Sequence, residues 1–435
     1  MTLSTQPYKG ARDFYPEDKR IQDYMFGVMR KVAKSYGYEE YDAPVLEPLE
    51  LYLSKSSAEI VNEQTYAFED RGGRKVVIRP EMTPTVSRLV AGRRQEFGYP
   101  LRLFSIPNLW RYERPQRGRL REHWQLNIDI FGLPGLSAEH ELIQLTNDLL
   151  KTYGAKSNMY KFRLNSRKFI NQLFSEYFEL DYSQSISLIR LIDRMHKMEF
   201  NKFAAQVDII LTTGQRELKI SDKILNILKV KSIEKLPSEI QSYDSIKDIQ
   251  ELIKLLKLSK IDNVEFDISL MRGFDYYTDI VFEAYDTDPD NNRAMFGGGR
   301  YDGLVAMFDV DPVPTVGFGL GDVTLQNFLE IHKLLPKIKS DTDLYASLIG
   351  EVYNDAVPIV NQLREMGINI ALDSSGSKLD KQIKNAIKKN IRYVIFIGEE
   401  EVKNNQFKLK DLVTQIEEPH SIERIVSIIK DFRKK

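Results

Sequence analysis

The sequence has no cysteine among its 435 residues. Disulfide bonds, thiolate zinc sites, iron–sulfur clusters and cysteine nucleophiles are therefore excluded. The histidines are few and scattered, with no spacing typical of metal ligands: His123, His140, His196, His332 and His420. We expect no transition metal held by the protein, so its chemistry must use other side chains.

Long apolar runs are also missing. No stretch of about 18 apolar residues is present, and the N-terminal segment MTLSTQPYKGARDFYPEDKR has no apolar signal region. With 42% hydrophobic and 29% charged residues, the composition is typical of a globular protein. We therefore predict a cytoplasmic protein.

Neither sign of charge is in large excess, because the formal net charge is only −1. A uniformly basic surface for nucleic acid is excluded, although one local basic face remains possible. Several nucleotide and hydrolase motifs are absent as well, namely G-x-x-x-x-G-K-[ST], G-x-S-x-G, H-E-x-x-H and a strand-anchored G-x-G-x-x-G. Walker-type ATPases, serine hydrolases and zincins therefore lose support.

The length favours two or three domains. Apolar residues at helical spacing predict a helix over 17–36, closed by Gly37. Residues 41–51 contain two prolines in an extended run, which favours an edge strand or a segment that pairs with a second subunit. Short β-like runs between 74 and 131, without a βαβ rhythm, predict an antiparallel sheet.

Residues 167–258 change to helical periodicity and are interpreted as an insertion within a domain covering 1–330. Strand-like patterns return at 264–285 and 314–325, so the sheet is expected to resume. After a linker at 331–342, strands and helices alternate and predict a small α/β domain over 343–435, whose last helix starts near His420.

Five arginines fall within eleven residues of the segment WRYERPQRGRLREHWQL: Arg111, Arg114, Arg117, Arg119 and Arg121. β-like runs flank them, which predicts a strand, a loop and a return strand. We call residues 111–121 the arginine loop. Guanidinium forks bind phosphate well, so the loop suits a nucleotide or a nucleic-acid end, although a solvated basic loop explains it about equally well.

The segment SLMRGFDYYTDIVFEAY places Arg272 near Tyr276 and Tyr277 in a predicted strand, where the two tyrosines would face opposite sides. One could be structural while the other lines a pocket. In RPEMTP, Glu81 and Thr83 precede a helix; Thr83 as its cap and Pro84 at its first position would explain the pattern without function. The segment MFGGGRYDGL is predicted to be a glycine-dense turn.

Taken together, these segments resemble the histidyl-tRNA synthetase family of class II aminoacyl-tRNA synthetases over nearly the whole chain. KGARDFYP (9–16) resembles the N-terminal signature and GYEEYDAPVLEP (37–48) the dimer-forming motif 1. RPEMT resembles the family's substrate-binding motif, and the arginine loop with its flanking strands resembles motif 2. LMRGFDYY and GGGRYDGL resemble two further motifs of the histidine enzymes. GSKLDKQIKNA resembles part of the anticodon-binding domain.

The resemblance implies an α/β (α+β) fold with a class II antiparallel catalytic sheet, a helical insertion and a C-terminal anticodon-binding domain, in a homodimer. It implies histidine activation with Mg²⁺-ATP as substrate and transfer to tRNA(His). Arg111 and Arg272 would be catalytic, and Arg111, Glu113 and Arg119 would bind ATP. The implied histidine contacts are Glu81, Met82, Thr83, Arg111, Gln125, Asp129, Arg272, Tyr276 and Tyr277. Arg114 and Gln116 would approach the tRNA acceptor end.

Two positions depart from the family pattern. Asp129 stands where many members have Glu, which keeps the charge. Motif 3 ends in G-x-G-h-E-R, whose arginine holds the γ-phosphate, but GFGLGDVT has Val323 and Thr324 in place of Glu and Arg. Another cation could replace it, ATP could bind more weakly, or the chain could be a non-catalytic relative. The rival interpretation is therefore a histidine-binding regulatory subunit of the ATP phosphoribosyltransferase type, which typically lacks the anticodon domain.

Overall fold

The computed structural model describes residues 3–53, 64–271, 276–291 and 293–433. The chain forms two compact units, Met1–Leu335 and Pro336–Lys435. The division falls inside the segment 331–342. Arg272 and the neighbouring residues 273–275 of the LMRGFDYY segment lie outside the described residues.

A nine-stranded sheet forms the centre of the first unit, in the order β1-β5-β7-β12-β11-β10-β8-β9, with β6 paired to β7. Its strands are β1 (Glu39–Glu40), β5 (Leu101–Ser105), β6 (Asn108–Trp110), β7 (Glu122–Phe131), β8 (Tyr160–Ser166), β9 (Val264–Phe266), β10 (Ile280–Asp286), β11 (Ala294–Arg300) and β12 (Thr315–Gly321). Only the outer pairs β1/β5 and β8/β9 are parallel. The predicted antiparallel sheet is confirmed.

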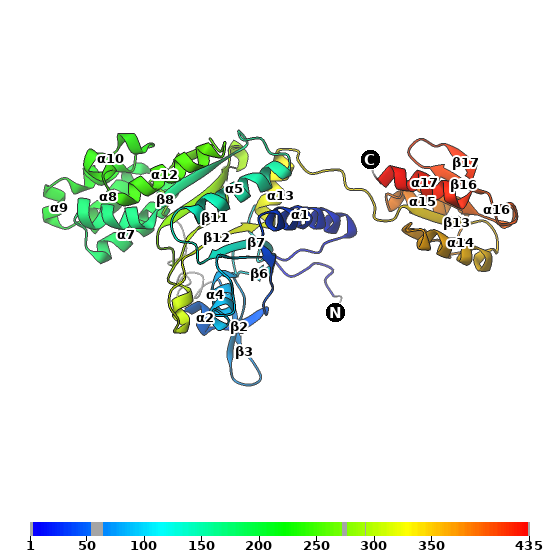
Figure 1. Cartoon of the computed structure of the whole chain (residues 1–435), viewed down its shortest axis with the longest axis horizontal. Helices are drawn as coiled ribbons and strands as arrows, with labels where there is room; N and C mark the ends of the chain where they lie inside the picture. Colours follow the sequence, from blue (N-terminus) through cyan, green and yellow to red (C-terminus); the bar gives the residue numbers. More distant parts are fainter. Residues whose placement is uncertain (1–2, 54–63, 272–275, 292, 434–435) are drawn as a thin grey trace. The chain divides into compact units, whose positions relative to one another are not determined.

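Helices α1 (Pro16–Ser35), α5 (Ser137–Thr152), α12 (Asp244–Leu258) and α13 (Asp322–Ile331) contribute to one large apolar core with this sheet (Figure 1). In α1, Pro16 starts the helix, acidic residues occupy the first turn and Lys34 the last. Gly37 follows with φ +79°, a conformation that glycine adopts without strain. The N-terminal helix was therefore predicted correctly to within a residue at each end.

Alternation along the strands separates two faces of the sheet. In β7, Leu126, Ile128 and Ile130 belong to the core beneath the helices. The intervening Gln125, Asn127 and Asp129 therefore point to the opposite face. That face holds the polar side chains discussed below.

A smaller sheet, β2-β4-β3, consists of β2 (Leu46–Pro48), β3 (Tyr66–Glu69) and β4 (Lys75–Ile78), and it is accompanied by α2 (Glu50–Leu53) and α4 (Thr83–Gly92). The proline-containing segment 41–51 supplies β2 at the edge of this sheet and the start of α2. The extended run is thus only three residues long, because Pro48 ends it.

Every regular element between Arg167 and Leu258 is helical, and Figure 1 shows most of them gathered beyond β8. They are α6 (Arg167–Gln172), η1 (Leu173–Tyr177), α7 (Tyr182–Asp193), η2 (Met195–Lys197), α8 (Phe200–Ile210), α9 (Thr213–Glu217), α10 (Ile220–Ile227), η3 (Ile233–Lys235), α11 (Ser238–Gln241) and α12. Capping boxes start α7 at Asp181 and α9 at Thr212.

The second unit has the sheet order β14-β13-β15-β16-β17. Its elements are β13 (Leu344–Leu348), α14 (Tyr353–Glu365), β14 (Ile370–Leu372), α15 (Leu379–Lys388), β15 (Tyr393–Ile397), α16 (Glu399–Asn404), β16 (Phe407–Asp411), β17 (Glu417–His420) and α17 (Ile422–Arg433). The sequence pattern missed α16 and the β16–β17 hairpin, because both are short and β17 is mostly exposed. The last helix begins at Ile422, two residues after His420.

Within the described residues, no helix is long and apolar enough to cross a membrane.

Candidate active site

A cavity of about 210 Å³ lies on the polar face of the main sheet. Six segments contribute to it: the start of α4, the beginning of the arginine loop, β7, the chain from Tyr276 into β10, and the glycine-rich strands β11 and β12. The lining residues are Glu81, Thr83, Arg111, Gln125, Asn127, Tyr276, Tyr277, Val281, Phe282, Glu283, Gly297, Gly298, Tyr301, Gly317, Phe318 and Gly319. Segments distant in sequence thus meet at one site.

Glycines in β12 leave room for two side chains of β7, Gln125 and Asp129. An ideal Cβ on Gly319 would lie 2.0 Å from Nε2 of Gln125, and one on Gly317 would lie 2.3 Å from Oδ1 of Asp129. The expectation of a glycine-dense turn at 295–304 was wrong, because residues 294–300 form strand β11, paired with β10 and β12. Close approach of neighbouring chain segments, rather than a turn, explains glycine here.

Glu81 and Tyr276 form a buried acid–hydroxyl pair in the cavity. The hydroxyl of Tyr276 donates to Oε2 of Glu81 at 3.1 Å, and the hydroxyl of Tyr52 donates to the Glu81 carbonyl oxygen at 3.2 Å. Burial, with Glu81 as the next contribution, holds the pKa of Tyr276 well above its ordinary value. Tyr276 therefore stays protonated and remains a hydrogen-bond donor.

Thr83 occupies the first position of α4, and Met82 is the cap residue. The predicted cap at Thr83 was therefore wrong by one residue, and Pro84 takes the second helical position. Thr83 lines the cavity, whereas Met82 is fully buried and does not.

Tyr276 and Tyr277 both line the cavity, with ring centroids 5.0 Å apart in an edge-to-face arrangement. The prediction that they face opposite sides of a strand was wrong. They precede β10, which begins only at Ile280, so strand alternation does not apply to them.

Asp129 is buried behind the cavity wall, and the hydroxyl of Tyr301 donates to its Oδ1. Oδ2 is also buried and has no hydrogen-bond partner within the described chain. Burial raises the pKa of Asp129 to about 7, against a lowering contribution from Tyr301. Tyr301 is a lining residue that the sequence reasoning missed, although it belongs to the GGGRYDGL segment.

Gln125 and Asn127 form a second polar pair, in which Nε2 of Gln125 donates to Oδ1 of Asn127 at 2.8 Å. Asn127 was also missed. The period-two spacing of Gln125, Asn127 and Asp129 in a strand was the available signal.

Arg111 enters the cavity from the start of the arginine loop, and its Nε donates to the Pro80 carbonyl oxygen at 2.8 Å. The predicted strand–loop–strand arrangement is confirmed by the antiparallel pairing of β6 with β7. Glu113 and Arg119 pair with each other at 3.4 Å and are not among the lining residues. Arg114 and Gln116 are exposed on the loop.

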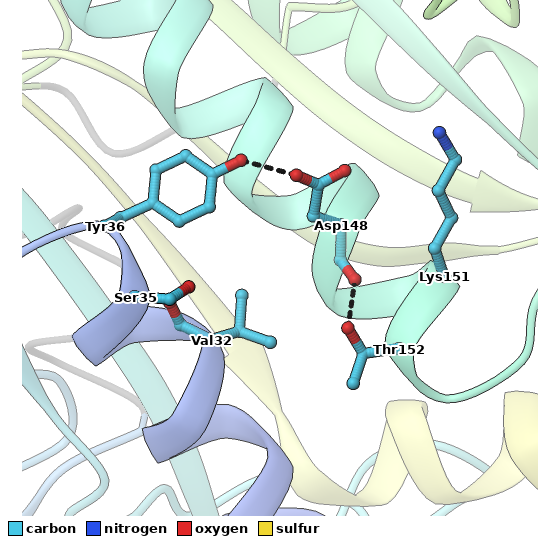
Figure 2. A pocket seen from close by; sticks show the side chains of 6 residues that line it. All are labelled: Val32, Ser35, Tyr36, Asp148, Lys151 and Thr152. Atoms are coloured by element: carbon cyan, nitrogen blue, oxygen red, sulfur yellow. Dashed lines mark hydrogen bonds between the residues drawn. The ribbon is translucent and has the colours of Figure 1, made fainter.

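A second hollow, of about 410 Å³, lies on the surface between α1 and α5 (Figure 2). The hydroxyl of Tyr36 donates to Oδ2 of Asp148 at 2.6 Å, while Lys151 extends away from this pair (Figure 2). Because the carboxylate already has its partner, this hollow does not combine groups suited to catalysis. Within the described residues, no group of three or more His, Cys, Asp or Glu side chains could hold a metal ion.

Two protein-family models match this chain. Residues 10–323, which make up more than half of the chain, match the family model of histidyl-tRNA synthetase. The chain belongs to the histidyl-tRNA synthetase family. Residues 346–432 also match the model of an anticodon-binding domain.

Full-length relatives in this family include the histidine–tRNA ligase of Leptospira biflexa, which is 41% identical over 99% of this chain and 98% of its own. The chloroplastic/mitochondrial histidine–tRNA ligase of Arabidopsis thaliana is 35% identical over 94% of this chain and 84% of its own. The crystal structure of histidyl-tRNA synthetase from Nostoc sp. PCC 7120 has the same fold, with a TM-score of 0.81 at 20% identity, covering 99% and 100% of the two chains. The class II fold is thus confirmed.

Proposed function

We propose that this histidyl-tRNA synthetase family member activates L-histidine with ATP and transfers it to the 3′ end of tRNA(His), forming histidyl-tRNA, AMP and diphosphate. The observation that carries the proposal is the buried Glu81–Tyr276 pair in the same cavity as Arg111. The full-length relatives named histidine–tRNA ligase support it. The match to an anticodon-binding domain argues against the regulatory-subunit alternative.

Adenylation is an in-line attack of the histidine carboxylate on the α-phosphate. It needs no covalent nucleophile, only alignment of two anions and neutralisation of developing charge. Arg111 contributes a guanidinium to the cavity and is assigned this role, together with Arg272. Glu113 and Arg119 are assigned to ATP, which enters as its Mg²⁺ complex, so the ion is part of the substrate.

Recognition of histidine uses its neutral imidazole, which offers one donor and one acceptor. Glu81 can accept a hydrogen bond and Tyr276, held protonated, can donate one. Thr83, Gln125 and Tyr277 complete the assigned contacts. An apolar amino acid would leave these buried polar groups without partners, which is the physical basis of its rejection.

Asp129 is assigned to the amino-acid pocket through Tyr301 rather than by direct contact, because Tyr301 lines the cavity and Asp129 does not. Met82 is assigned a packing role next to Glu81 for the same reason.

Arg114 and Gln116 are assigned to the tRNA acceptor end, because both are exposed at the arginine loop. The nucleotide expected to contact them is the additional guanosine at the 5′ end of tRNA(His). Its removal should slow aminoacylation by the wild type more than by Gln116→Ala. Equal sensitivity of the two proteins would refute the assignment. Binding of tRNA should also weaken steeply with salt, as expected for phosphate contacts.

Residues 37–48 are assigned to a homodimer interface, and the protein to the cytoplasm. The assigned domains are a catalytic domain over 1–330 with a helical insertion at 167–258, a linker at 331–342 and an anticodon-binding domain over 343–435. Two observations favour the domain assignments: the helical character of the insertion and the division of the chain after Leu335.

The deciding experiment is exchange between ATP and pyrophosphate, with each of the twenty amino acids supplied separately to the full chain. Exchange with histidine alone is expected. Histidine binding without exchange for any amino acid would overturn the proposal in favour of the regulatory alternative, and would make Thr324 the first residue to examine.

A further inference from the structure

The start of α13 carries no cation at the position where motif 3 has its arginine. Thr324 occupies that position. Its hydroxyl lies 2.8 Å from the Met295 carbonyl oxygen and 3.0 Å from that of Gly321. The Thr324 hydroxyl is therefore hydrogen-bonded to backbone carbonyl oxygens, and this uncharged side chain cannot neutralise a phosphate.

The tip of the arginine loop lies beside this helix start. Gly118 has φ +78°, and an ideal Cβ on it would lie 3.6 Å from Cγ2 of Thr324. The chain between Arg117 and Arg119 thus passes next to the residue at the motif 3 position. Charged groups anchored at this tip are candidates to replace it.

Arg293 is anchored at the tip from the opposite side. It directly precedes β11, and its Nη1 donates to the Arg117 carbonyl oxygen at 2.9 Å. In return, Nη1 of Arg117 donates to the Asp290 carbonyl oxygen at 3.3 Å. The Arg293 guanidinium therefore lies one residue from Gly118, whereas that of Arg117 turns towards the short 3-10 helix η4 (Pro289–Asn291).

Two other nearby arginines, Arg12 and Arg119, each have a carboxylate partner, and Arg119 has already been assigned to ATP. Nη2 of Arg12 lies 2.6 Å from Oδ2 of the buried Asp322, and Arg119 pairs with Glu113 at 3.4 Å. Within the described part of the chain, Arg293 forms no ion pair and donates only to a backbone carbonyl. Its charge remains for an anion, and guanidinium groups bind phosphate oxygens well.

Arg293 also lies along the line of the cavity. Gly297 and Gly319, which line the cavity, are paired across β11 and β12. From them, β11 leads back to Arg293 and β12 leads forward to Thr324. Arg293 and Thr324 therefore lie towards the same end of the two antiparallel strands.

We propose that Arg293 holds the terminal phosphates of ATP in place of the absent motif 3 arginine, an inference that rests on the proposed adenylation activity. In this chain the cation lies just before β11 instead of at the start of α13. The hydrogen bond to the Arg117 carbonyl oxygen orients the Arg293 guanidinium, so that the arginine loop and Arg293 lie together at the triphosphate.

Arg293→Gln tests the proposal in histidine-dependent ATP–pyrophosphate exchange. The KM for ATP should rise about ten- to hundredfold, as expected for loss of a charge-assisted contact, while the KM for histidine stays within about twofold. The inhibition constant of AMP should not change, because AMP lacks the terminal phosphates. Arg293→Lys should show a smaller rise, and Arg190→Gln, on the exposed side of α7, should match the wild type.

The double variant Arg293→Gln, Thr324→Arg restores a cation at the motif 3 position and should recover much of the affinity for ATP. The proposal is overturned if Arg293→Gln leaves the KM for ATP unchanged. It is also overturned if the substitution weakens the binding of AMP as much as that of ATP, which would indicate a structural effect. Failure of the proposed function looks different, because the wild type itself would then show no exchange.

Discussion

The hydroxyl of Tyr301 donates a hydrogen bond to Oδ1 of Asp129, and both residues are almost completely buried. This contact links a lining residue of the cavity to a carboxyl group whose pKa is raised to about 7. The cavity therefore has a polar layer behind its surface, and ligand binding there should depend on that layer.

Tyr301→Phe removes this hydrogen bond while keeping the ring. We expect the KM for histidine in ATP–pyrophosphate exchange to rise about tenfold, as for loss of a buried hydrogen bond, with the KM for ATP unchanged. Tyr345→Phe is the matched control, because Tyr345 donates to Asp373 in the second unit, which this tRNA-independent assay does not use. An equal rise in both KM values would contradict a specific role in the histidine pocket.

The stability of the ligand-free protein should depend on pH through Asp129. Burial raises its pKa from 3.8 to about 7, so the folded state retains a proton that the unfolded chain releases between these values. The contribution of Asp129 to stability is complete below pH 3.8 and is lost as the pH rises through 7. Between pH 4 and pH 8, the free energy of unfolding of Asp129→Asn should rise by up to about 4 kcal/mol relative to that of the wild type.

Denaturant unfolding at several pH values, without histidine or ATP, measures this difference. Asp262→Asn, which removes an exposed carboxylate, should follow the wild type throughout. A constant difference between Asp129→Asn and the wild type over the whole range would show that Asp129 does not titrate as described.

Gly319→Ala should block the cavity. The added Cβ would fall 2.0 Å from Nε2 of Gln125, so that side chain must move. We expect the KM for histidine to rise at least about tenfold, with a modest loss of stability because Gln125 is flexible. Exchange kinetics and thermal unfolding measure the two effects separately.

Gly27→Ala is the matched control for Gly319→Ala. Gly27 lies in α1, and an added Cβ meets nothing within 4 Å. This variant should be more stable than the wild type by up to about 1 kcal/mol, because alanine favours helix, and its kinetics should not change. An unchanged KM in Gly319→Ala would mean that Gln125 does not contact histidine.

The Arg12–Asp322 ion pair should be strongly coupled. Asp322 is fully buried, lies 2.6 Å from Arg12 and accepts a hydrogen bond from the Trp124 backbone N–H at 3.0 Å. Arg12→Leu leaves this carboxylate buried without its cation, so it should lower the free energy of unfolding by about 3–5 kcal/mol. Arg12→Leu combined with Asp322→Leu should cost less than Arg12→Leu alone. Denaturant unfolding of the four proteins gives the coupling, and strict additivity would contradict it.

Much of the site could be predicted from sequence because its groups lie in short, recognisable segments. Glu81, Thr83, Arg111 and Gln125 all line the cavity as the motif resemblance implied. Tyr301 and Asn127 were missed, since each becomes a lining residue only when β7, β11 and β12 are side by side. The roles of these residues remain predictions for the experiments above.

The errors had local causes. Tyr276 and Tyr277 were placed in a strand because aromatic residues favour strands, but the strand starts three residues later. The glycines of β11 were assigned to a turn because glycine usually marks one, whereas here the pairing with β12 and the side chains near it require its small size.

The sequence by itself determined most of the longer elements, the order of the motifs and the family, because apolar periodicity and short motifs are local properties of the chain. Only the tertiary structure decided which groups meet. It showed that Asp129 lies behind Tyr301, that the Thr324 hydroxyl is hydrogen-bonded to backbone carbonyl oxygens, and that Arg293 contacts the tip of the arginine loop. Such relationships depend on strand register and burial, which bring together residues that no local pattern connects.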